Sequence, residues 1–286
     1  MRAKPISGHT RIFGLIGHPV RHSLSPVMYN RLFNRFGLDA VYLAFDVDPG
    51  NADTVADIIR VMGLDGVNLT VPFKEELLKQ IDSSTAAARE AGAVNVVTHI
   101  DGTLTGYNTD GEGFVRSLAE EGGPDMDGLT AIILGAGGAA RAVASGLLDR
   151  GAEKLIFLNR TVHRAEIAAE ALRLSFANAS ISAEPLTKAT YSKHAKDSLL
   201  VVNCTSGPAN ETIAAFEPCE LAKGASWVDI NYWMNNPPCR TKCLDADVRF
   251  HDGLGMLAHQ GALAFELFTG YPVTGAELRA FLVEQA

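Results

Sequence analysis

The sequence predicts an α/β protein with two α/β domains flanking a cleft, the second of them built on a doubly wound parallel sheet. Three observations lead to this prediction. Short apolar segments of strand length alternate with segments of helical periodicity along most of the chain. A glycine-rich turn lies near the middle, between an apolar run and a helical segment. The chain has 286 residues, which is long for one hydrophobic core and suits two domains of ordinary size.

The first half of the chain predicts alternating strands and helices. Residues 11–16 form a short apolar run typical of a strand. Ser25 followed by Pro26 predicts a helix with Ser25 as its N-cap and proline at the first helical position, extending to about Phe36. Such a succession favours a mostly parallel sheet, in which ligands bind beyond the carboxyl ends of the strands. We expect further strands at residues 41–47, 66–71, 93–99 and 103–108, and further helices at residues 51–62 and 73–80.

The middle of the chain carries a dinucleotide-binding fingerprint of the pattern G-x-G-x-x-A. It follows the apolar run at residues 130–134 and precedes a helical segment at residues 141–150. A buried strand, a turn whose glycines let the backbone approach a pyrophosphate, and a helix N-terminus facing that anion are what such a site requires. We therefore expect a Rossmann-type domain from about residue 128, with the cofactor contacted by Gly135, Ala136, Gly137, Gly138 and Ala139.

The next predicted strand, residues 154–159, indicates which dinucleotide is bound. In NAD enzymes this strand ends in a carboxylate that binds the ribose 2′-hydroxyl. Here it ends in Asn159, Arg160 and Thr161, with Arg164 following. A guanidinium can hold a 2′-phosphate by charge-assisted hydrogen bonds, whereas a carboxylate would repel it, so these residues favour NADP over NAD. The alternative is that both arginines are ordinary charges on a solvated helix start.

Composition argues against several classes of partner. The chain has 25 basic and 33 acidic residues, a formal net charge of −8 and a pI near 5.5, which argues against binding to nucleic acid or to an anionic membrane. No stretch approaches the roughly 18 apolar residues that a membrane span needs, and the N-terminus lacks the apolar region of a signal peptide. We therefore expect a cytoplasmic protein with a small-molecule substrate.

The cysteines do not form a metal-binding pattern. They are sparse for a chain of this length, and the pair Cys239 and Cys243 has no second ligand pair at the spacing of a zinc site. We expect these thiols to be buried or incidental. The sequence therefore predicts no metal centre.

Polar side chains concentrate where the predicted strands of the first half end. Asn68 and Thr70 share one face of a strand, because side chains alternate along it, and Lys74 follows just after the break at Pro72. Each of these residues, taken alone, also fits an ordinary role such as a helix cap, a turn or a solvated helix start. The other polar residues at predicted strand ends are Ser23, Ser25, Asn95, Thr109 and Asp110.

The number and order of these polar strings identify a resemblance. Over nearly its whole length the chain resembles the shikimate dehydrogenase family. Any one of the matching strings is weak by itself, but together they are specific. They are Gly-His-Pro-Val-Arg-His-Ser-Leu-Ser-Pro from Gly17, Asn-Leu-Thr-Val-Pro-Phe-Lys from Asn68, Gly-Ala-Val-Asn from Gly92, Asn-Thr-Asp-Gly from Asn108, Gly-Ala-Gly-Gly-Ala from Gly135, Asn-Arg-Thr from Asn159, and Asp-Gly-Leu-Gly-Met-Leu from Asp252 with Gln260.

The resemblance implies an activity and the residues that perform it. It implies that NADPH delivers hydride to the ketone of 3-dehydroshikimate, giving shikimate in a reaction of aromatic amino-acid (chorismate) biosynthesis. It implies that Lys74 and Asp110 form the catalytic pair, in which an ammonium held by a carboxylate protonates the new alkoxide. It also implies a pocket for a polyhydroxylated cyclohexene carboxylate, lined by Ser23, Ser25, Asn68, Thr70, Asn95, Tyr232 and Gln260.

The resemblance also sets the expected domain boundaries. Residues 1–115 would form the substrate-binding domain, completed by C-terminal helices at residues 258–286, because Gln260 belongs to the substrate pocket. Residues 116–257 would form the NADP-binding Rossmann domain, with a hinge near residues 113–128 and 250–258. Further cofactor contacts are expected at Thr205, Ser206, Ile230, Gly253 and Met256.

Several alternatives stay open on the sequence alone. The chain departs from the family pattern after Ser206, where Gly207 comes one place early and Pro208 follows, and again directly after Tyr232. A quinate/shikimate or aminoshikimate dehydrogenase would share the pocket strings. A protein of a different class, a non-catalytic NADP-binding sensor, would share the fold and lack a catalytic group. The oligomeric state is expected to be a monomer or a homodimer.

Overall fold

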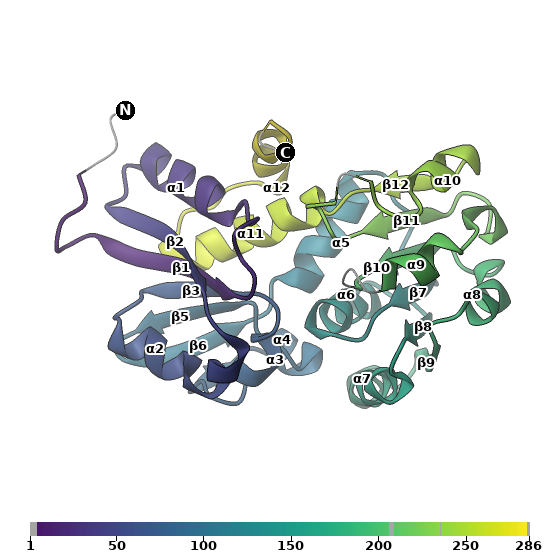
Figure 1. The fold of residues 1–286 in the computed structure, drawn as a ribbon, viewed down its shortest axis with the longest axis horizontal. Coiled ribbons are helices and arrows are strands. Elements are labelled where there is room, and N and C mark those ends of the chain that lie inside the picture. Colours follow the sequence, from purple (N-terminus) through teal and green to yellow (C-terminus); the bar gives the residue numbers. More distant parts are fainter. Residues whose placement is uncertain (1–4, 206–208, 235, 285–286) are drawn as a thin grey trace. The chain divides into compact units, whose positions relative to one another are not determined.

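The computed structural model describes residues 5–205, 209–234 and 236–284. The chain divides into two compact units. The first comprises Met1–Thr109 together with Ala258–Ala286, and the second comprises Asp110–Leu257. In Figure 1 the yellow C-terminal segment accordingly belongs with the purple and blue elements of the first unit. Each unit has its own sheet and its own hydrophobic core.

The first unit is built on a six-stranded mixed sheet. In spatial order its strands are β2 (Ala40–Asp46), β1 (Arg11–Gly17), β3 (Gly66–Leu69), β5 (Val96–Ile100), β6 (Thr103–Tyr107) and β4 (Ser83–Ser84). β1 pairs in parallel with β2 and β3, whereas β5 pairs antiparallel with both β3 and β6. Asp101 and Gly102, with φ angles of 49° and 78°, join β5 to β6 in a two-residue turn. The sheet is mixed because so short a turn leaves no room for a crossover helix.

Helix α1 (Ser25–Phe36) has the predicted length, but the prediction of its cap was wrong. Ser25 is the first helical residue and Leu24 is the N-cap, which makes no side-chain capping bond. The hydroxyl of Ser23 instead accepts a hydrogen bond from the Ser25 N–H at 3.2 Å. Pro26 follows in the first turn and has no N–H for a cap to bind, which removes the usual partner of an N-cap side chain.

The other helices of the first unit are short. The segment predicted as one helix at residues 51–62 is a 3-10 turn, η1 (Pro49–Thr54), followed by α2 (Val55–Val61). The helix predicted at residues 73–80 is limited to α3 (Lys74–Leu77). The remaining helices that lie wholly in this unit are α4 (Ala86–Ala91) and α12 (Gly275–Val283).

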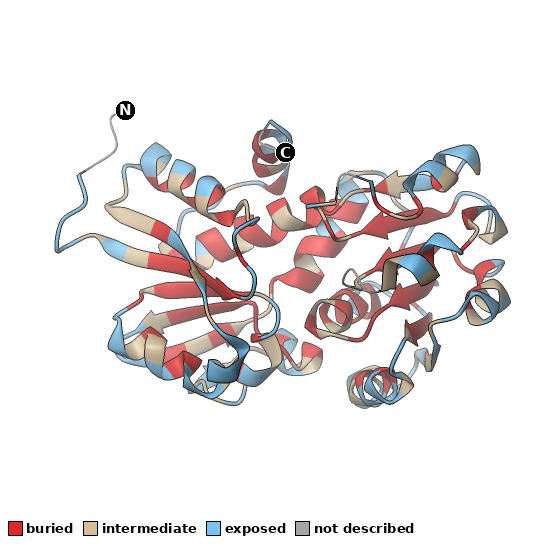
Figure 2. Ribbon diagram, viewed as in Figure 1, coloured by how far each residue is buried: buried red, intermediate tan, exposed pale blue. Residues whose placement is uncertain are grey.

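The C-terminal helix α11 (Leu254–Thr269) fills the core of the first unit with its later residues. The ring of Phe268 lies 5.1 Å from the ring of Phe13 on β1, measured between centroids. A Cβ at Gly66 would lie 2.7 Å from Phe268, so glycine on β3 makes room for this ring. Figure 2 shows β3 and most of α11 in the red of buried residues. Because an apolar sheet face must be covered, the returning helix is a structural part of the first unit.

The second unit is built on a six-stranded sheet whose neighbouring strands all pair in parallel. In spatial order the strands are β12 (Arg249–His251), β11 (Ser226–Asp229), β10 (Leu200–Asn203), β7 (Thr130–Leu134), β8 (Lys154–Asn159) and β9 (Ser180–Pro185). The strand order reverses between β10 and β7. This confirms the doubly wound sheet predicted from the sequence, in which a dinucleotide binds beyond the carboxyl ends of the strands at the reversal.

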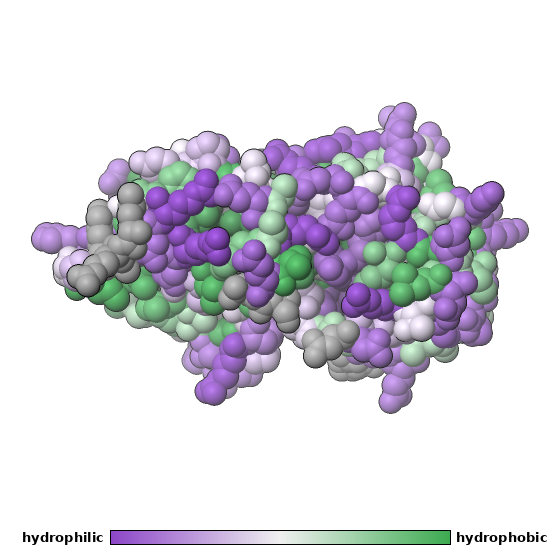
Figure 3. All heavy atoms as spheres, turned by 90° about the horizontal axis from the view of Figure 1, so that it is seen from above, coloured by the Kyte–Doolittle hydropathy of each residue, from purple (hydrophilic) through white to green (hydrophobic). Residues whose placement is uncertain are grey.

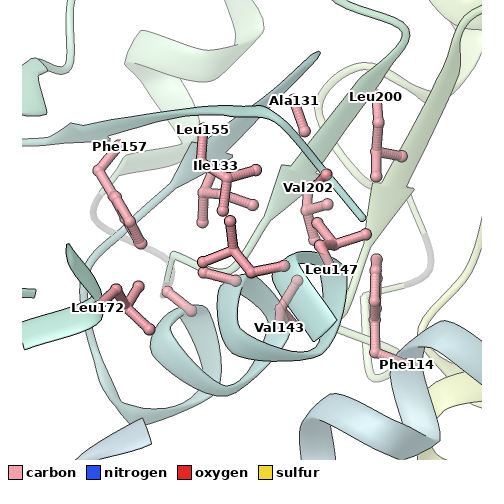
Figure 4. Close-up of a cluster of buried hydrophobic side chains, with 14 of the residues drawn as sticks. Phe114, Ala131, Ile133, Val143, Leu147, Leu155, Phe157, Leu172, Leu200 and Val202 are labelled. Atoms are coloured by element: carbon pink, nitrogen blue, oxygen red, sulfur yellow. The ribbon is translucent and has the colours of Figure 1, made fainter. Parts of the chain in front are cut away.

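Helices cover both faces of this second sheet. They are α5 (Asp110–Glu120), α6 (Gly138–Asp149), α7 (Val162–Ser175), α8 (Lys188–Ala195), α9 (Asn210–Ala214) and α10 (Arg240–Asp245), with a 3-10 turn, η3 (Pro218–Glu220). Because side chains alternate along β7, Ile133 points into the core beneath α6 and Ile132 into the core on the opposite face. Figure 4 shows Ile133 and Val202 against Val143 and Leu147 of α6.

The surface is mostly hydrophilic on the face shown in Figure 3, with apolar side chains lying between polar ones. Some large apolar side chains are exposed, among them Val61, Leu174 and Leu244, which is ordinary for a folded protein. In the part of the chain that the structure describes, no helix is long and apolar enough to cross a membrane.

Two glycines allow α5 and α6 to pack backbone against backbone. A Cβ at Gly111 would lie 2.3 Å from the carbonyl oxygen of Ala142, and a Cβ at Gly146 would lie 2.7 Å from the carbonyl oxygen of Gly111. Real Cβ atoms do not approach other atoms this closely. The contact therefore needs glycine at both positions, and it fixes the start of α5 against α6 within the second unit.

We predict that Gly146→Ala destabilises the protein by about 1–3 kcal/mol, because its Cβ meets a backbone carbonyl that cannot move aside. Gly261→Ala in α11 is the matched control. Its Cβ would meet the terminal methyl of Met28 at 2.5 Å, a flexible group, and alanine improves helix propensity by roughly 1 kcal/mol. Chemical denaturation should show a loss for the first variant and little change for the second. Equal losses would show that the backbone contact is not what matters.

Candidate active site

Polar residues predicted in the first half gather at one edge of the first sheet. β1 and β3 end at this edge, and β5, which runs antiparallel to β3, begins there. Asn68 lies near the end of β3, Thr70 follows it, and Asn95 directly precedes β5. The side-chain amide of Asn68 donates to the carbonyl oxygen of Asn95 at 3.3 Å. The structure thus brings the two predicted asparagines into contact.

The side chain of Asn68 is oriented by a tyrosine that sequence reasoning did not select. Tyr42 on β2 donates its hydroxyl to Asn68 Oδ1 at 2.7 Å, and both side chains are buried. The ring of Tyr42 stacks on that of Tyr29 with centroids 4.4 Å apart. Tyr29 in turn donates to the carbonyl oxygen of Gly261 at 3.3 Å, and burial raises the pKa of Tyr29. A buried tyrosine on a strand carries no sequence signal that separates this role from packing.

Asn95 joins the predicted site to the returning C-terminal helix. Its Oδ1 accepts from the Thr109 N–H at 2.8 Å, and its Nδ2 donates to Thr109 Oγ1 at 2.9 Å. Nδ2 also lies 3.4 Å from Gln260 Oε1 on α11. All three residues are buried. The structure therefore places Gln260 beside Asn95, although 165 positions separate them in the chain.

Lys74 is anchored next to Asn95 through its main chain. It is the half-buried first residue of α3, and its carbonyl oxygen accepts from the Val94 N–H at 2.8 Å. Since Val94 directly precedes Asn95, this hydrogen bond ties the start of α3 to the segment that carries the amide. The cation is thus carried at the same edge of the sheet as the polar cluster.

The remaining predicted residues of the first unit lie on the segments that follow β1 and β3. Ser25 is buried at the start of α1 and Ser23 is half-buried just before it. A Cβ at Gly17, the last residue of β1, would lie 2.1 Å from Thr70 Cγ2. Only glycine at this position allows the segment after β3 to pack against the end of β1. Thr70 is held there by a main-chain hydrogen bond to Ile16 at 3.0 Å.

Asp110 belongs to the second unit. It is the first residue of α5 and only 4% exposed, and the contact between Gly111 and α6 fixes its position in that unit. The far end of α5 is also held, because Glu121 pairs with the buried His251 at the end of β12 at 3.1 Å. The carboxylate is therefore carried on a helix anchored to the second unit at both ends.

The glycine-rich turn has the geometry that a dinucleotide needs. Gly135 has a φ of 103°, which other residues rarely adopt. Gly137 is the N-cap of α6, and a Cβ there would meet nothing within 4 Å, so the space over this turn is open. The first N–H groups of α6 begin at this open turn, where they can bind a pyrophosphate. Of the other fingerprint residues, Ala136 and Gly138 are buried and Ala139 is half-buried.

The end of β8 presents a cation at the position that selects the cofactor. Arg160 is exposed, and within the described residues it makes no hydrogen bond or ion pair. Asn159 donates to the carbonyl oxygen of Thr161 at 2.8 Å, which shapes the turn into α7. Thr161 and Arg164 are also exposed. These residues fit a ribose 2′-phosphate, because a guanidinium at the surface can bind it without first breaking an ion pair.

The loop after β10 lies beside the fingerprint. A Cβ at Gly135 would lie 3.1 Å from the carbonyl oxygen of Cys204 and 3.4 Å from Thr205 Cγ2. The structure therefore brings Thr205, a predicted cofactor contact, next to the first glycine of the turn. Ser206, predicted with it, lies outside the described residues.

The loops after β11 and β12 also meet. A Cβ at Gly253 would lie 2.4 Å from the carbonyl oxygen of Ile230, so these two predicted residues are packed together. Met256 is buried in the first turn of α11. Tyr232 is half-buried, with its ring edge-on to Trp233 at 5.2 Å.

The cysteines are free thiols. Cys239 and Cys243 are buried in the core of the second unit, and this burial raises the pKa of both thiols to about 12. Among the residues that the structure describes, no cluster of histidine, cysteine, aspartate and glutamate could hold a metal ion.

Comparison with known protein families finds three matches along the chain. Residues 15–97 match a shikimate dehydrogenase substrate binding domain. Residues 117–231 match the model described as shikimate / quinate 5-dehydrogenase. Residues 253–272 match a shikimate 5′-dehydrogenase C-terminal domain.

Individual proteins are similar over almost the full length. The shikimate dehydrogenase (NADP(+)) of Methanopyrus kandleri is 40% identical over 285 residues, which cover 98% of this chain and 97% of the relative. The crystal structure of shikimate 5-dehydrogenase from Thermus thermophilus in complex with NADP(H) and shikimate aligns with a TM-score of 0.80 at 32% identity, covering 96% of this chain and 100% of that one. Quinate dehydrogenase from Corynebacterium glutamicum in complex with NAD aligns with a TM-score of 0.82 at 26% identity, covering 96% and 99%.

Proposed function

The chain belongs to the shikimate dehydrogenase family, and on this basis we propose that it catalyses the reversible, NADP-dependent reduction of 3-dehydroshikimate to shikimate. The observation that carries the proposal is that the family similarity spans both units. The substrate-binding model covers the first unit, and the dehydrogenase model covers the second. Substrate binding is accordingly assigned to the first unit and NADP binding to the second. The reaction belongs to aromatic amino-acid biosynthesis.

Lys74 and Asp110 are assigned the acid–base chemistry. NADPH, when bound, supplies the hydride. Hydride addition places negative charge on the ketone oxygen, so the site needs a cation or a proton donor close to that oxygen. The Lys74 ammonium would supply both charge and proton, and the Asp110 carboxylate would favour and orient the ammonium form. In the reverse direction the same two groups would take up the proton of the substrate hydroxyl.

The buried amides of the first unit suit a polyhydroxylated ring. Asn68, Asn95 and Gln260 present amide groups at one edge of the sheet, held by the hydrogen bonds described above. A ring hydroxyl that pairs with such a group would be missed by a substrate that lacks it. Leaving one buried polar group unpaired costs on the order of 1–3 kcal/mol, so such a substrate should be disfavoured roughly 5- to 150-fold.

A quinate/shikimate dehydrogenase is the second candidate. The similarity to quinate dehydrogenase and the joint description of the matched family model favour it. Quinate is a saturated relative of shikimate, and the pocket residues of the first unit do not separate the two. The exposed Arg160 favours the NADP-dependent shikimate activity. An aminoshikimate dehydrogenase or a non-catalytic sensor would be revealed by the same assay.

The cellular setting belongs to the proposal as well. The acidic composition, with a net charge of −8, supports an enzyme without nucleic-acid or membrane partners. We place it in the cytoplasm, as a monomer or a homodimer.

We predict a strong preference for shikimate with NADP in initial-rate oxidation assays with shikimate and quinate, each with NADP and with NAD. Nicotinamide absorbance reports the rates. Better turnover of quinate, or equal use of NAD, would move the enzyme to the dual-substrate class. No reaction in any of the four mixtures, together with intact NADPH binding, would support the sensor.

We predict that Lys74→Ala lowers kcat by roughly 10²–10⁴, because a positioned acid–base group is lost, while NADPH binding is largely spared. Lys79→Ala is the control, since Lys79 is exposed just beyond α3 and pairs with Glu76 there, at 3.0 Å. Turnover and NADPH affinity are measured for both variants. Activity of Lys74→Ala within a few-fold of the wild type would remove Lys74 from the mechanism.

We predict that Arg160→Ala weakens NADPH far more than NADH, because only NADPH carries the 2′-phosphate. Arg240→Ala, in the helix α10 of the same unit, controls for the loss of an exposed charge. Dissociation constants for both cofactors can be followed by nicotinamide fluorescence. Equal losses for NADPH and NADH would refute the phosphate contact.

A further inference from the structure

A closed ring of buried hydrogen bonds joins the ends of β10 and β11. Asn203 is the last residue of β10 and Asp229 the last of β11, and the two are partners in the parallel register. Their exposed fractions are 0% and 2%. Asp229 Oδ2 accepts from Asn203 Nδ2 at 2.8 Å. The ionised carboxylate brings a negative charge into a ring whose other members are amides, a hydroxyl and main-chain groups.

The ring closes through Asn231 and Thr205. Asp229 Oδ1 accepts from the main-chain N–H of Asn231 at 3.0 Å and from its Nδ2 at 2.8 Å. Asn231 Nδ2 also donates to the carbonyl oxygen of Thr205 at 3.0 Å. Asn203 Oδ1 accepts from Thr205 twice, from its N–H at 3.1 Å and from its hydroxyl at 2.7 Å. Both polar faces of Thr205 are therefore held by the two asparagines.

Asp229 sets the direction of every bond in this ring. A carboxylate only accepts hydrogen bonds, so the amide of Asn203 must turn its NH₂ toward Asp229 and its oxygen toward Thr205. The same holds for Asn231, whose NH₂ faces the carboxylate. An uncharged amide at position 229 would leave two NH₂ groups facing each other. The orientation of Thr205 is thus a consequence of the charge at position 229.

The ring lies at the part of the sheet that would receive one half of the cofactor. Thr205 is next to Gly135 of the glycine-rich turn. Ile230 directly follows Asp229, and its carbonyl oxygen is packed against Gly253. With the 2′-phosphate assigned to Arg160 after β8, and the pyrophosphate to the start of α6, the nicotinamide half falls over the ends of β10 and β11.

The buried charge has a cost that packing alone does not explain. Burial raises the pKa of Asp229, and the hydrogen bonds from Asn203 and Asn231 only partly oppose this rise. Ionised groups are expensive to bury, and apolar residues of similar volume often stabilise a fold equally well. A carboxylate retained here suits a role in orientation.

We propose that Asp229 is a positioning residue for the nicotinamide half of NADP(H). Its carboxylate orients Asn203 and Asn231, and through them the loop at Thr205, without touching the cofactor itself. This inference rests on the proposed function, since it takes the bound ligand to be NADP(H).

The test compares Asp229→Asn with the charge swap Asp229→Asn plus Asn203→Asp. The swap restores the ring, because the amide introduced at position 229 can donate to the new carboxylate at position 203 and accept from Asn231. The new carboxylate can still accept from Thr205. Asp245→Asn, an exposed carboxylate on α10 of the same unit, is the control. Each variant is measured for thermal unfolding and for binding of NADPH and of adenosine 2′,5′-bisphosphate, which carries only the adenosine half.

Asp229→Asn should weaken NADPH binding roughly 5- to 150-fold, leave adenosine 2′,5′-bisphosphate within about twofold of the wild type, and regain most NADPH affinity in the swap. Unchanged NADPH binding, equal weakening of both ligands, or no recovery in the swap would overturn the proposal. If only the single variant fails to fold, the swap alone decides. If neither folds, the ring is needed for folding and the positioning role is wrong. Wild-type protein that binds no NADPH would instead overturn the proposed function.

Discussion

Buried polar side chains at strand ends need hydrogen bonds, and this constraint organises both units. In the first unit Asn68 and Asn95 are buried where β3 ends and β5 begins, and their partners come from β2, from Thr109 and from the returning helix α11. In the second unit Asp229 is buried where β11 ends, and its partners come from β10 and from the residues that follow β11. Since an unpaired buried polar atom costs about 1–3 kcal/mol, each cluster ties remote segments into one arrangement.

The same clusters explain how a cofactor and a substrate could be held without a strongly charged surface. The protein is acidic overall, so anionic ligands must be bound by local groups. The second unit supplies an open helix N-terminus at Gly137 and the exposed Arg160, at the two places where a dinucleotide phosphate is expected. The first unit supplies amides and hydroxyls, which suit a ring rich in hydroxyl groups. Charge is used sparingly and at defined positions.

Glycine plays a different part in each unit. In the second unit Gly135 adopts a positive φ next to Cys204, and Gly111 lets α5 approach α6, so backbone atoms lie where side chains would otherwise stand. In the first unit Gly17 and Gly66 make room for Thr70 and Phe268. The glycines of the fingerprint could be interpreted from sequence because the spacing is shared by many proteins. The others depend on what happens to pack against them.

The sequence by itself determined the doubly wound sheet of the second unit and the strand and helix near the N-terminus, because apolar periodicity and the glycine-rich turn are local signals. It also determined the family, through strings of polar residues in order. It did not determine the cap of α1, the mixed sheet of the first unit or the part played by Tyr42. Only the tertiary structure decided that Asn95 meets Gln260 and that Asp229 meets Asn203, because hydrogen bonds between distant segments follow from packing and leave no spacing in the chain.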